Sequence, residues 1–360
     1  MFKYLITIQP LGFMYGSAGA FLSPENLVGR SGAKFPPDAA TLSGLFFSAN
    51  KDQEFASHAD LAEELRVAGP FWAFVDAEDD FYVPLPRHKI IGKDDYDEWT
   101  IKNYKWCLKS EREDSDQKED QKKEESEYRW LRIDYWDESA EVIYRDCTAE
   151  RPSVAENCWK YIPVLHPQLK KDERHVLPED GLFLENAVQM NDDTCLVYLS
   201  NYPLESGWYQ FGGEGHMVEL KSIELRDDSR ILTLLRESIQ QAFALLTPGV
   251  WGSNQLSTRY PKQHGFAEDN NKIALLTDKA VAYRYRIGYG EKKKEGFRDR
   301  DPGRLSRGRY AVPAGSVYVL RAPLNDPWWK FPKEWFPEKG LLQKFGCGLC
   351  LPVHIEGVNE

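Results

Sequence analysis

The chain has 360 residues, a length that favours about two domains and supplies enough apolar residues for two cores. Its formal net charge of −11 argues against a protein that coats nucleic acid without selectivity. No segment approaches the roughly 18 apolar residues that a membrane span needs, and residues 1–8 are too short for a signal peptide. The cysteines are scattered along the chain, so we expect a cytoplasmic protein without structural disulfides.

The first predicted elements are a strand, a loop and a helix. Alternating apolar and polar residues predict a strand over 3–9, and a glycine-rich loop follows as far as residue 32. Asp38 is placed to cap a helix whose apolar face carries Leu42, Leu45 and Phe46. Further along, the pattern predicts a second helix over 58–67, a hairpin of 71–75 with 81–83, and strands over 181–188 and 194–199.

The charged segment 109–129 interrupts this pattern. It has 21 residues, of which 15 are charged, and both signs are present. Such a segment cannot bury enough apolar surface to fold alone, so it reads as a solvated insertion or a disordered loop. Aromatic clusters flank it on both sides, which predicts an extended hairpin within an insertion of about 90–140.

The second half has fewer clear elements. Helical periodicity predicts a helix over 231–243, and shorter apolar runs predict four strands, over 244–249, 280–288, 316–320 and 348–355. Strands outnumber long helices throughout, and no internal repeat has a fixed period. The chain therefore reads as an α+β protein, most simply two small antiparallel sheets that are each covered by helices.

Residues 212–216, with the sequence Gly-Gly-Glu-Gly-His, form the most distinctive glycine-rich turn. Glycine permits positive φ and leaves backbone N–H groups unshielded, so a bent RNA strand can approach closely, and His216 can stack or donate to a phosphate. The candidate RNA-binding residues here are Gly212, Gly213, Gly215 and His216. A tight turn between two strands is the alternative, because short glycine patterns are weak signals.

Two further segments carry positive charge. Arg30 and Lys34 precede the N-terminus of the first helix, where the helix dipole favours an anion, although they can also be two solvated surface cations. The segment 284–309 has ten Lys or Arg against four Asp or Glu and interleaves them with aromatic residues, as suits single-stranded RNA. Its candidate RNA-binding residues are Arg284, Arg286, Arg298, Arg304, Arg307 and Arg309. A mobile loop whose charge aids solubility is the alternative.

We find no pattern of catalysis or of metal binding. The P-loop, H-E-x-x-H and G-x-S-x-G motifs are absent from the sequence, so we expect no catalytic residues and no cofactor. Cys347 and Cys350 form a CxxC without a partner pair, which favours buried packing over a metal site. A role for His216 as an acid or base in RNA cleavage is a minor hypothesis.

Three segments carry a resemblance to a known family. These are the proline-led first helix at 35–44, the glycine turn at 212–216 and the segment 309–318. Together they resemble the RAMP superfamily of CRISPR effector proteins, and within it the type III-B (Cmr) subunit that caps the 5′ handle of the guide RNA. The segment 309–318 is the most specific of the three, and residues 90–180 match nothing in the family.

The resemblance implies a fold and a role. It implies two ferredoxin-like domains with long insertions, at residues 1–220, with the insertion of about 90–140, and 221–360. It implies a non-catalytic subunit that binds the crRNA 5′ handle, the large polymerase-like subunit and the backbone RAMP subunit, that meets target RNA indirectly, and that has no membrane partner. A thumb-like hairpin is expected in the insertion. A RAMP endoribonuclease that processes precursor crRNA, the type III-D counterpart and a protein-only scaffold remain alternatives.

Overall fold

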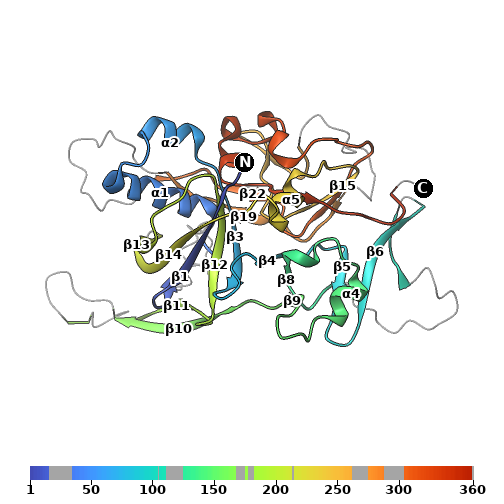
Figure 1. Ribbon diagram of the computed structural model, residues 1–360, viewed down its shortest axis with the longest axis horizontal. Helices are drawn as coiled ribbons and strands as arrows, with labels where there is room; N and C mark the ends of the chain where they lie inside the picture. Colours follow the sequence, from blue (N-terminus) through green and yellow to red (C-terminus); the bar gives the residue numbers. More distant parts are fainter. Residues whose placement is uncertain are drawn as a thin grey trace.

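The computed structural model describes residues 1–15, 35–103, 105–110, 125–167, 175–176, 182–212, 215–261, 275–287 and 304–358. Within these ranges the protein is an α+β structure with many strands and few helices, as the sequence predicts (Figure 1). None of the helices in these ranges is both long enough and apolar enough to cross a membrane.

An eight-stranded antiparallel sheet forms the centre of the molecule. Its strands, in spatial order, are β13 (Gly207–Phe211), β14 (His216–Glu224), β1 (Tyr4–Pro10), β12 (Thr194–Ser200), β3 (Val67–Phe74), β4 (Tyr82–Pro84), β8 (Trp130–Arg132) and β9 (Val154–Ala155). β1 and β12 confirm the strands predicted over 3–9 and 194–199. The predicted hairpin is also confirmed, because Trp72 of β3 pairs with Tyr82 of β4.

Two helices cover one face of this sheet (Figure 1). α1 (Ala39–Gln53) buries Leu42, Leu45 and Phe46 against the sheet, as its apolar face predicts. Asp38 occupies the N-cap position, but its side chain makes no capping hydrogen bond. α2 (His58–Glu64) is shorter than predicted, because the chain turns extended at Leu65 and enters β3 at Val67.

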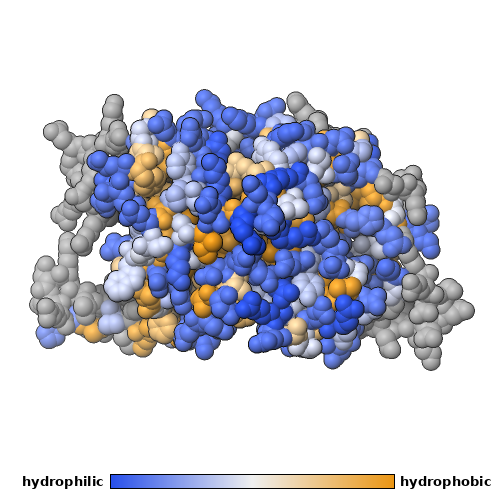
Figure 2. All heavy atoms as spheres, viewed as in Figure 1, coloured by the Kyte–Doolittle hydropathy of each residue, from blue (hydrophilic) through white to orange (hydrophobic). Residues whose placement is uncertain are grey.

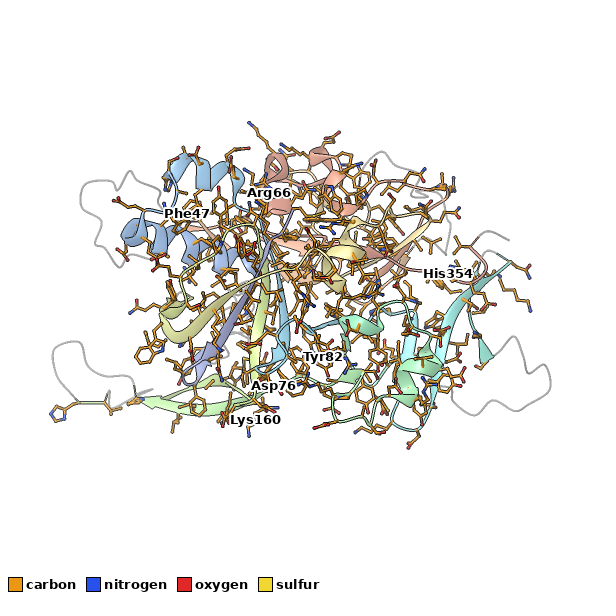
Figure 3. All side chains as sticks on the ribbon, viewed as in Figure 1. Phe47, Arg66, Asp76, Tyr82, Lys160 and His354 are labelled. Atoms are coloured by element: carbon orange, nitrogen blue, oxygen red, sulfur yellow. The ribbon has the colours of Figure 1, made fainter. Side chains whose placement is uncertain are left out.

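A long two-stranded ribbon extends below the central sheet (Figure 1). It consists of β10 (Trp159–Pro167) and β11 (Leu182–Met190), and the short β2 (Met14–Tyr15) pairs with β11. Hydrophobic atoms gather along the lower edge of the face in Figure 2, where Figure 1 places the ribbon. Lys160 lies on the ribbon's outer side, whereas Tyr82 lies inside the sheet (Figure 3).

The insertion forms a small accessory unit at the opposite end of the molecule (Figure 1). Its strands are β5 (Lys89–Ile91), β6 (Tyr96–Lys102) and β7 (Lys105–Leu108), and the chain returns through η2 (Ile133–Tyr135) and α4 (Ala140–Arg145). β6 and β7 pair as a hairpin, but both lie before the charged segment. The returning strand β8 pairs with β4 and β9 in the central sheet, so the extended hairpin predicted from the two aromatic clusters is wrong. Most of the charged segment, residues 111–124, lies outside the described residues.

The second half is built on a four-stranded antiparallel sheet, preceded by α5 (Arg230–Arg236). Its order is β18 (Leu275–Leu276), β23 (Val317–Val319), β15 (Ala242–Leu245) and β24 (Cys350–Pro352). The helix predicted over 231–243 is too long, since Ala242 and Phe243 belong to β15. β15 is paired on both edges and buried on both faces, and such a strand has the continuous apolar run that a buried helix also has.

Short elements complete this half. The strand predicted over 280–288 is divided into two pieces. The short strands pair as β16 (Trp251–Gly252) with β17 (Ser257–Thr258), β19 (Val281–Tyr283) with β22 (Arg309–Ala311), and β20 (Arg286–Ile287) with β21 (Arg304–Leu305). Four short helical segments follow, namely η3 (Trp328–Lys330), η4 (Lys333–Trp335), η5 (Glu338–Gly340) and α6 (Leu341–Lys344).

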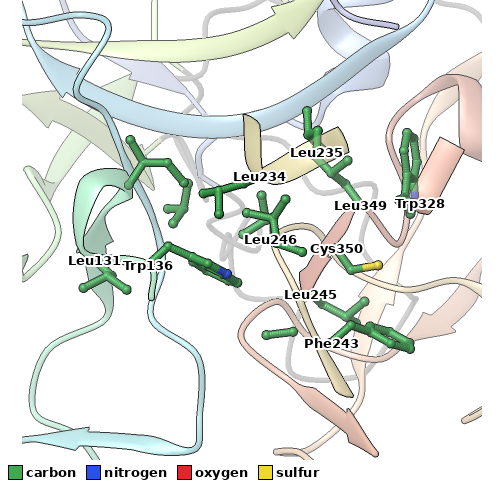
Figure 4. Close-up of a cluster of buried hydrophobic side chains, with 14 of the residues drawn as sticks. Leu131, Trp136, Leu234, Leu235, Phe243, Leu245, Leu246, Trp328, Leu349 and Cys350 are labelled. Atoms are coloured by element: carbon green, nitrogen blue, oxygen red, sulfur yellow. The ribbon is translucent and has the colours of Figure 1, made fainter. Parts of the chain in front are cut away.

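One hydrophobic core joins the two sheets (Figure 4). The face of the central sheet opposite α1 contributes Leu5 and Phe71, α5 contributes Leu234, and the second sheet contributes Phe243 and Leu351. The tryptophan-rich segment after residue 327 covers this core, with buried Trp328, Phe331, Trp335 and Phe336. The indole N–H of Trp136 donates to the carbonyl oxygen of Pro352 at 2.8 Å, which ties the insertion to β24.

Candidate nucleic-acid interface

The glycine-rich turn joins the edge strands β13 and β14. Gly212 and Gly215 have φ angles of 80° and 66°, and the N–H of Gly215 donates to the carbonyl oxygen of Gly212 at 3.2 Å. A Cβ built on Gly212 meets no heavy atom within 4 Å, so conformation and not packing calls for glycine there. The surrounding space is open to a ligand. Gly213 lies outside the described residues.

His216 links this turn to the N-terminal loop. Its Nε2 accepts a hydrogen bond from the backbone N–H of Tyr15 at 3.0 Å, and the two rings stack with centroids 5.7 Å apart. A neutral imidazole that accepts at Nε2 carries its proton on Nδ1. Nδ1 is therefore a donor of the kind that binds a phosphate oxygen. The hydrogen bond at Nε2 holds the imidazole ring in its orientation.

The N-terminal loop carries two predicted cations, Arg30 and Lys34, and both lie outside the described residues. The structure shows where the loop begins and ends. It leaves from Tyr15 beside His216, and it returns at Phe35, whose ring packs edge-on against Trp159 at the start of β10, with centroids 5.2 Å apart.

The end of the loop is fixed by Tyr198. The hydroxyl of this residue donates to the carbonyl oxygen of Pro37 at 2.7 Å. Burial raises the pKa of Tyr198 well above its ordinary value, so the hydroxyl keeps the proton that it donates. The ends of the loop are therefore anchored beside the glycine turn and at the foot of the ribbon.

The two ends of the basic segment are held together by the paired strands β20 and β21. The Arg284 guanidinium donates through Nε to the carbonyl oxygen of Ser306 at 2.9 Å, and the backbone N–H of Tyr285 donates to the Ser306 hydroxyl at 3.0 Å. Arg286 and Arg307 are exposed, and Arg307 also donates to the carbonyl oxygen of Gln255. Arg298 lies outside the described residues, as does the side chain of Arg304, whose backbone is in β21.

Arg309 differs from its neighbours because its side chain is only 4% exposed. It forms an ion pair with Glu338 at 2.9 Å and donates to the carbonyl oxygen of Ser253 at 3.1 Å. The Tyr285 hydroxyl bonds to the same carboxylate. This guanidinium faces protein rather than solvent, so any part it has in RNA binding is indirect, through the fold of the segment that carries Arg307.

The rest of the C-terminal motif is also internal. Gly315 has a φ of 81°, and a Cβ there would lie 2.7 Å from the carbonyl oxygen of Leu85. Its N–H donates to Leu245 and its carbonyl oxygen accepts from Arg87. Glycine is therefore required by close packing between the two halves of the chain. The segment 309–318, which carries the most specific part of the resemblance, therefore packs the second half of the chain against the first.

The basic segment and the end of the N-terminal loop meet at one small cluster of buried residues. This cluster contains Tyr285 of the basic segment and Tyr283, which precedes it, together with Leu342 and Cys347. Ala40, in the first turn of α1, packs against the same cluster. The basic segment therefore rises beside the point where the N-terminal loop enters α1, and that loop begins beside the glycine turn.

Sequence reasoning missed two parts of this region. Tyr15 was not singled out, although it anchors His216. The strand β10 was not predicted either, although residues 159–165 are rich in aromatic and branched side chains and would have given the signal. The ribbon exposes Tyr161 and Leu165, at 42% and 58%.

Cys347 and Cys350 are both buried in the packing of the second half of the chain. Cys347 is buried, and its thiol donates to the Tyr283 hydroxyl at 3.0 Å. Cys350 is buried in β24, and burial raises the pKa of its thiol well above the ordinary value. In the part of the chain that the structure describes, no group of three or more His, Cys, Asp or Glu is placed to hold a metal ion.

Comparison with known proteins identifies the family. The family model for the CRISPR-associated protein Cas_Cmr3 matches residues 7–354. Comparison with curated proteins finds no match.

Solved structures have a similar fold at low sequence identity. A chain of the type III-B Cmr-beta complex bound to cognate target RNA and AMPPnP has a TM-score of 0.50 and 12% identity, and the match covers 88% of this chain and 86% of that chain. A chain of the Csm1-Csm4 cassette in complex with pppApA has a TM-score of 0.37 and 10% identity, over 89% and 87% of the two chains. A family model that matches nearly the whole sequence confirms the resemblance: the chain belongs to the Cas_Cmr3 family of CRISPR-associated proteins.

Proposed function

We propose that the protein is a non-catalytic subunit that binds guide RNA, caps the crRNA 5′ handle and links the large polymerase-like subunit to the backbone RAMP filament in antiviral defence. The observation that carries this proposal is the hydrogen bond from the Tyr15 N–H to His216. It places the glycine turn and the start of the N-terminal loop in one site. An open turn beside a ring nitrogen that donates suits a bent phosphate backbone.

Positive charge at the same site supports RNA as the ligand. Arg286 and Arg307 are exposed on the basic segment, which carries a local excess of cations in an otherwise acidic chain. Its foot packs beside the first turn of α1, where the N-terminal loop ends. A phosphate chain that passes from the glycine turn toward α1 would meet the cations of the basic segment.

The strand order of both sheets supports two ferredoxin-like units. Four strands of the central sheet form the first unit, which are β1, β3, β12 and β14 in chain order. In space they lie in the order β14, β1, β12, β3, which is the 4-1-3-2 order of a ferredoxin-like sheet. The second sheet has the strands β15, β18, β23 and β24 in chain order. In space they lie in the order β24, β15, β23, β18, which is the same 4-1-3-2 order. The boundary predicted at residue 220 falls inside β14, which pairs with β1 as far as Glu224, so we assign the units to residues 1–224 and 225–360. The second crossover of the first unit carries β13 in place of a helix, which departs from the simple pattern.

The thumb-like hairpin fits the ribbon better than the insertion. Each strand of the ribbon has nine residues, which corresponds to a length of about 30 Å, and the ribbon starts at the loop anchor formed by Phe35 and Trp159. The hairpin of β6 and β7 lies at the other end of the molecule (Figure 1). We propose that the ribbon lies along the guide RNA and its target.

His216 is better suited to binding than to cleavage. A general acid or base must exchange a proton with the reacting group, and Nε2 of His216 is already engaged by the Tyr15 N–H. Only Nδ1 remains, and it donates. His216 therefore has no free acceptor for base catalysis, and only its Nδ1–H is left to act as an acid.

Binding of RNA across a salt series tests the proposal. The full chain is mixed with a single-stranded RNA that bears the repeat-derived 5′ end, or with a scrambled RNA, and the dissociation constant is measured between low and high salt. We expect preferential binding that weakens as salt rises, because phosphate contacts release counterions. The double variant Arg286→Glu, Arg307→Glu should weaken binding and reduce the salt slope by about two.

Arg145→Glu is the matched control, because its side chain is 70% exposed on α4 in the distant insertion. It should leave binding unchanged. If both RNAs bind equally, or neither binds, the same series is repeated on the reconstituted effector complex. Equal affinity for the two 5′ ends in that complex would refute handle capping.

A further inference from the structure

A cavity at the base of the ribbon lies outside the site described so far. It has a volume of about 450 Å³ and lies between the end of β1 and the turn that joins β11 to β12. This volume falls within the range of small-molecule sites. Its walls include Gln9, Leu11 and Phe13 from one side and Gln189, Asn191 and Asp192 from the other.

The lining of this cavity is aromatic and amide-rich. Phe13 is one of the residues that line the cavity, and it is 47% exposed. Gln9 donates through Nε2 to the carbonyl oxygen of Asp192 at 3.0 Å, so its Oε1 is left as an acceptor. Among the described residues, none bonds to the side-chain amides of Gln189 and Asn191, so these amides keep both donors and acceptors.

The charge of the lining excludes two other kinds of ligand. None of the described residues that line the cavity is Lys or Arg, and Asp192 is the single charged group. A phosphate would find no cation there. A metal ion would find too few hard ligands, in agreement with the absence of metal-binding groups among the described residues. A planar group that stacks and forms several hydrogen bonds along its edge fits what remains.

The cavity is continuous with the candidate RNA interface through the chain itself. Phe13 is separated from Tyr15 by a single residue, and the N–H of Tyr15 donates to His216. The N–H of Leu11 donates to the carbonyl oxygen of Met217, the residue that follows His216, at 3.1 Å. A strand of RNA whose phosphate meets His216 therefore has the cavity within reach of an adjacent base.

We infer that this cavity binds one unstacked nucleobase of the guide RNA, with Phe13 as the stacking surface and the amides of Gln9, Gln189 and Asn191 as readers of the base edge. The inference rests on the proposed guide-RNA binding and adds to it a site that selects a base. Single-stranded RNA is commonly recognised in this way, by aromatic stacking and hydrogen bonds to the exposed edge of a base.

A scan with abasic guides tests the inference. The chain is assembled with its partner subunits and with guide RNAs that each lack one base in the repeat-derived 5′ end, and each dissociation constant is measured. We expect one position at which base removal weakens binding by about 5- to 100-fold, the range that base–aromatic stacking supplies. Phe13→Ala should weaken binding of the intact guide by the same factor and abolish the penalty at that position alone.

Two further variants sharpen the test. Gln189→Leu keeps the volume of the side chain and removes the amide, so it should leave stacking in place and reduce discrimination between bases at the sensitive position. Tyr96→Ala is the matched control, because this ring is 44% exposed on β6 in the distant insertion. It should leave every position of the scan unchanged.

The outcomes separate this inference from the proposed function. A wild-type complex that prefers the repeat-derived end but shows equal penalties at all abasic positions refutes the base site and leaves handle capping intact. A complex with no preference for that end refutes both. If Phe13→Ala impairs assembly of the subunits without RNA, the cavity receives a side chain of a partner protein, and the base site is refuted.

Discussion

Individual arginines in the basic segment have different roles, and their burial distinguishes them. Arg309 is buried and paired with Glu338, whereas Arg307, two residues before it, is exposed. A cation on the surface is stabilised by water with or without a partner, but a buried cation depends on its partner. Charge alone therefore cannot identify the arginines that contact RNA.

Substitution of these two arginines should affect stability unequally. Arg309→Ala leaves the carboxylate of Glu338 without its ion pair in a partly buried position, and we expect a loss of about 3 kcal/mol in the free energy of unfolding. Arg307→Ala should cost less than about 0.5 kcal/mol. Unfolding in urea, followed by fluorescence, measures both. Equal losses for the two variants would contradict the structural role of Arg309.

Asp80 should give the protein a pH-dependent stability. Burial, and then the nearby charge of Asp134, raise the pKa of Asp80 from 3.8 to about 6, against the opposing effect of Arg132. The folded protein therefore binds this proton more tightly than the unfolded chain between about pH 4 and 6. Stability from this group is present below that window and is lost as the pH rises through it.

Removal of the neighbouring charge tests this effect. Asp134→Asn takes away the second cause of the shift, so the variant should lose less stability than the wild type between pH 4.5 and pH 7. The difference should be on the order of 1 kcal/mol. Thermal unfolding at a series of pH values gives the measurement. Glu156→Gln, at an exposed site, should leave the wild-type profile unchanged, and an unchanged profile for Asp134→Asn would contradict the argument.

The solvated part of the charged segment 109–129 is shorter than the composition of the segment suggests. Its first and last parts make specific contacts, since Lys109 approaches Glu98 and Glu356, and the Ser126 hydroxyl donates to the carbonyl oxygen of Ile91 at 2.7 Å. The backbone N–H of Glu127 also donates to the carbonyl oxygen of Ile91. Composition over a window cannot resolve where such contacts begin.

Two deletions distinguish the contacting ends of this segment from its middle. Replacement of residues 112–123 by a short Gly-Ser linker should leave the melting temperature nearly unchanged, because it removes none of these contacts. Deletion of the whole segment 109–129 should lower it by several degrees, since the bonds to Ile91 disappear. Differential scanning fluorimetry compares the two variants. A similar loss in both would show that the middle also stabilises the fold.

Strands and helices differed in how well the sequence predicted them. β1 and α1 each have one buried face, so their periods of two and 3.6 residues are visible in the sequence, and both were predicted correctly. β15 is buried on both faces and has no period, which is why residues 242 and 243 were taken for helix. Local sequence cannot report pairing to β23 and β24, which lie far along the chain.

The candidate site was predicted in composition but not in geometry. The glycine turn and the cations were recognised from residue types. The structure packs the basic segment beside the first turn of α1 and the start of the N-terminal loop beside the glycine turn. The bond between Tyr15 and His216 spans 201 residues, so no local pattern could indicate it. The burial of Arg309 likewise depends on Glu338, which is distant in sequence.

At the scale of the whole molecule, the shared hydrophobic core couples the stability of the two halves. The units assigned to 1–224 and 225–360 each have a sheet, but the core between them contains buried residues of both (Figure 4). Gly315 and Trp136 add hydrogen bonds that cross the same boundary. Neither half could separate without exposing this apolar surface to water.

The two halves should therefore unfold together. Leu245, in β15, is fully buried in the shared core, and Leu245→Ala should cost about 2–5 kcal/mol. Because the core belongs to both sheets, hydrogen exchange should accelerate equally in β1 and β12 of the first sheet and in β15 and β23 of the second. Leu256→Ala, at an exposed site, should change neither. If the loss of protection stayed within residues 225–360, the two ferredoxin-like units would be independently stable, and the RNA interface would join two bodies that can move relative to each other.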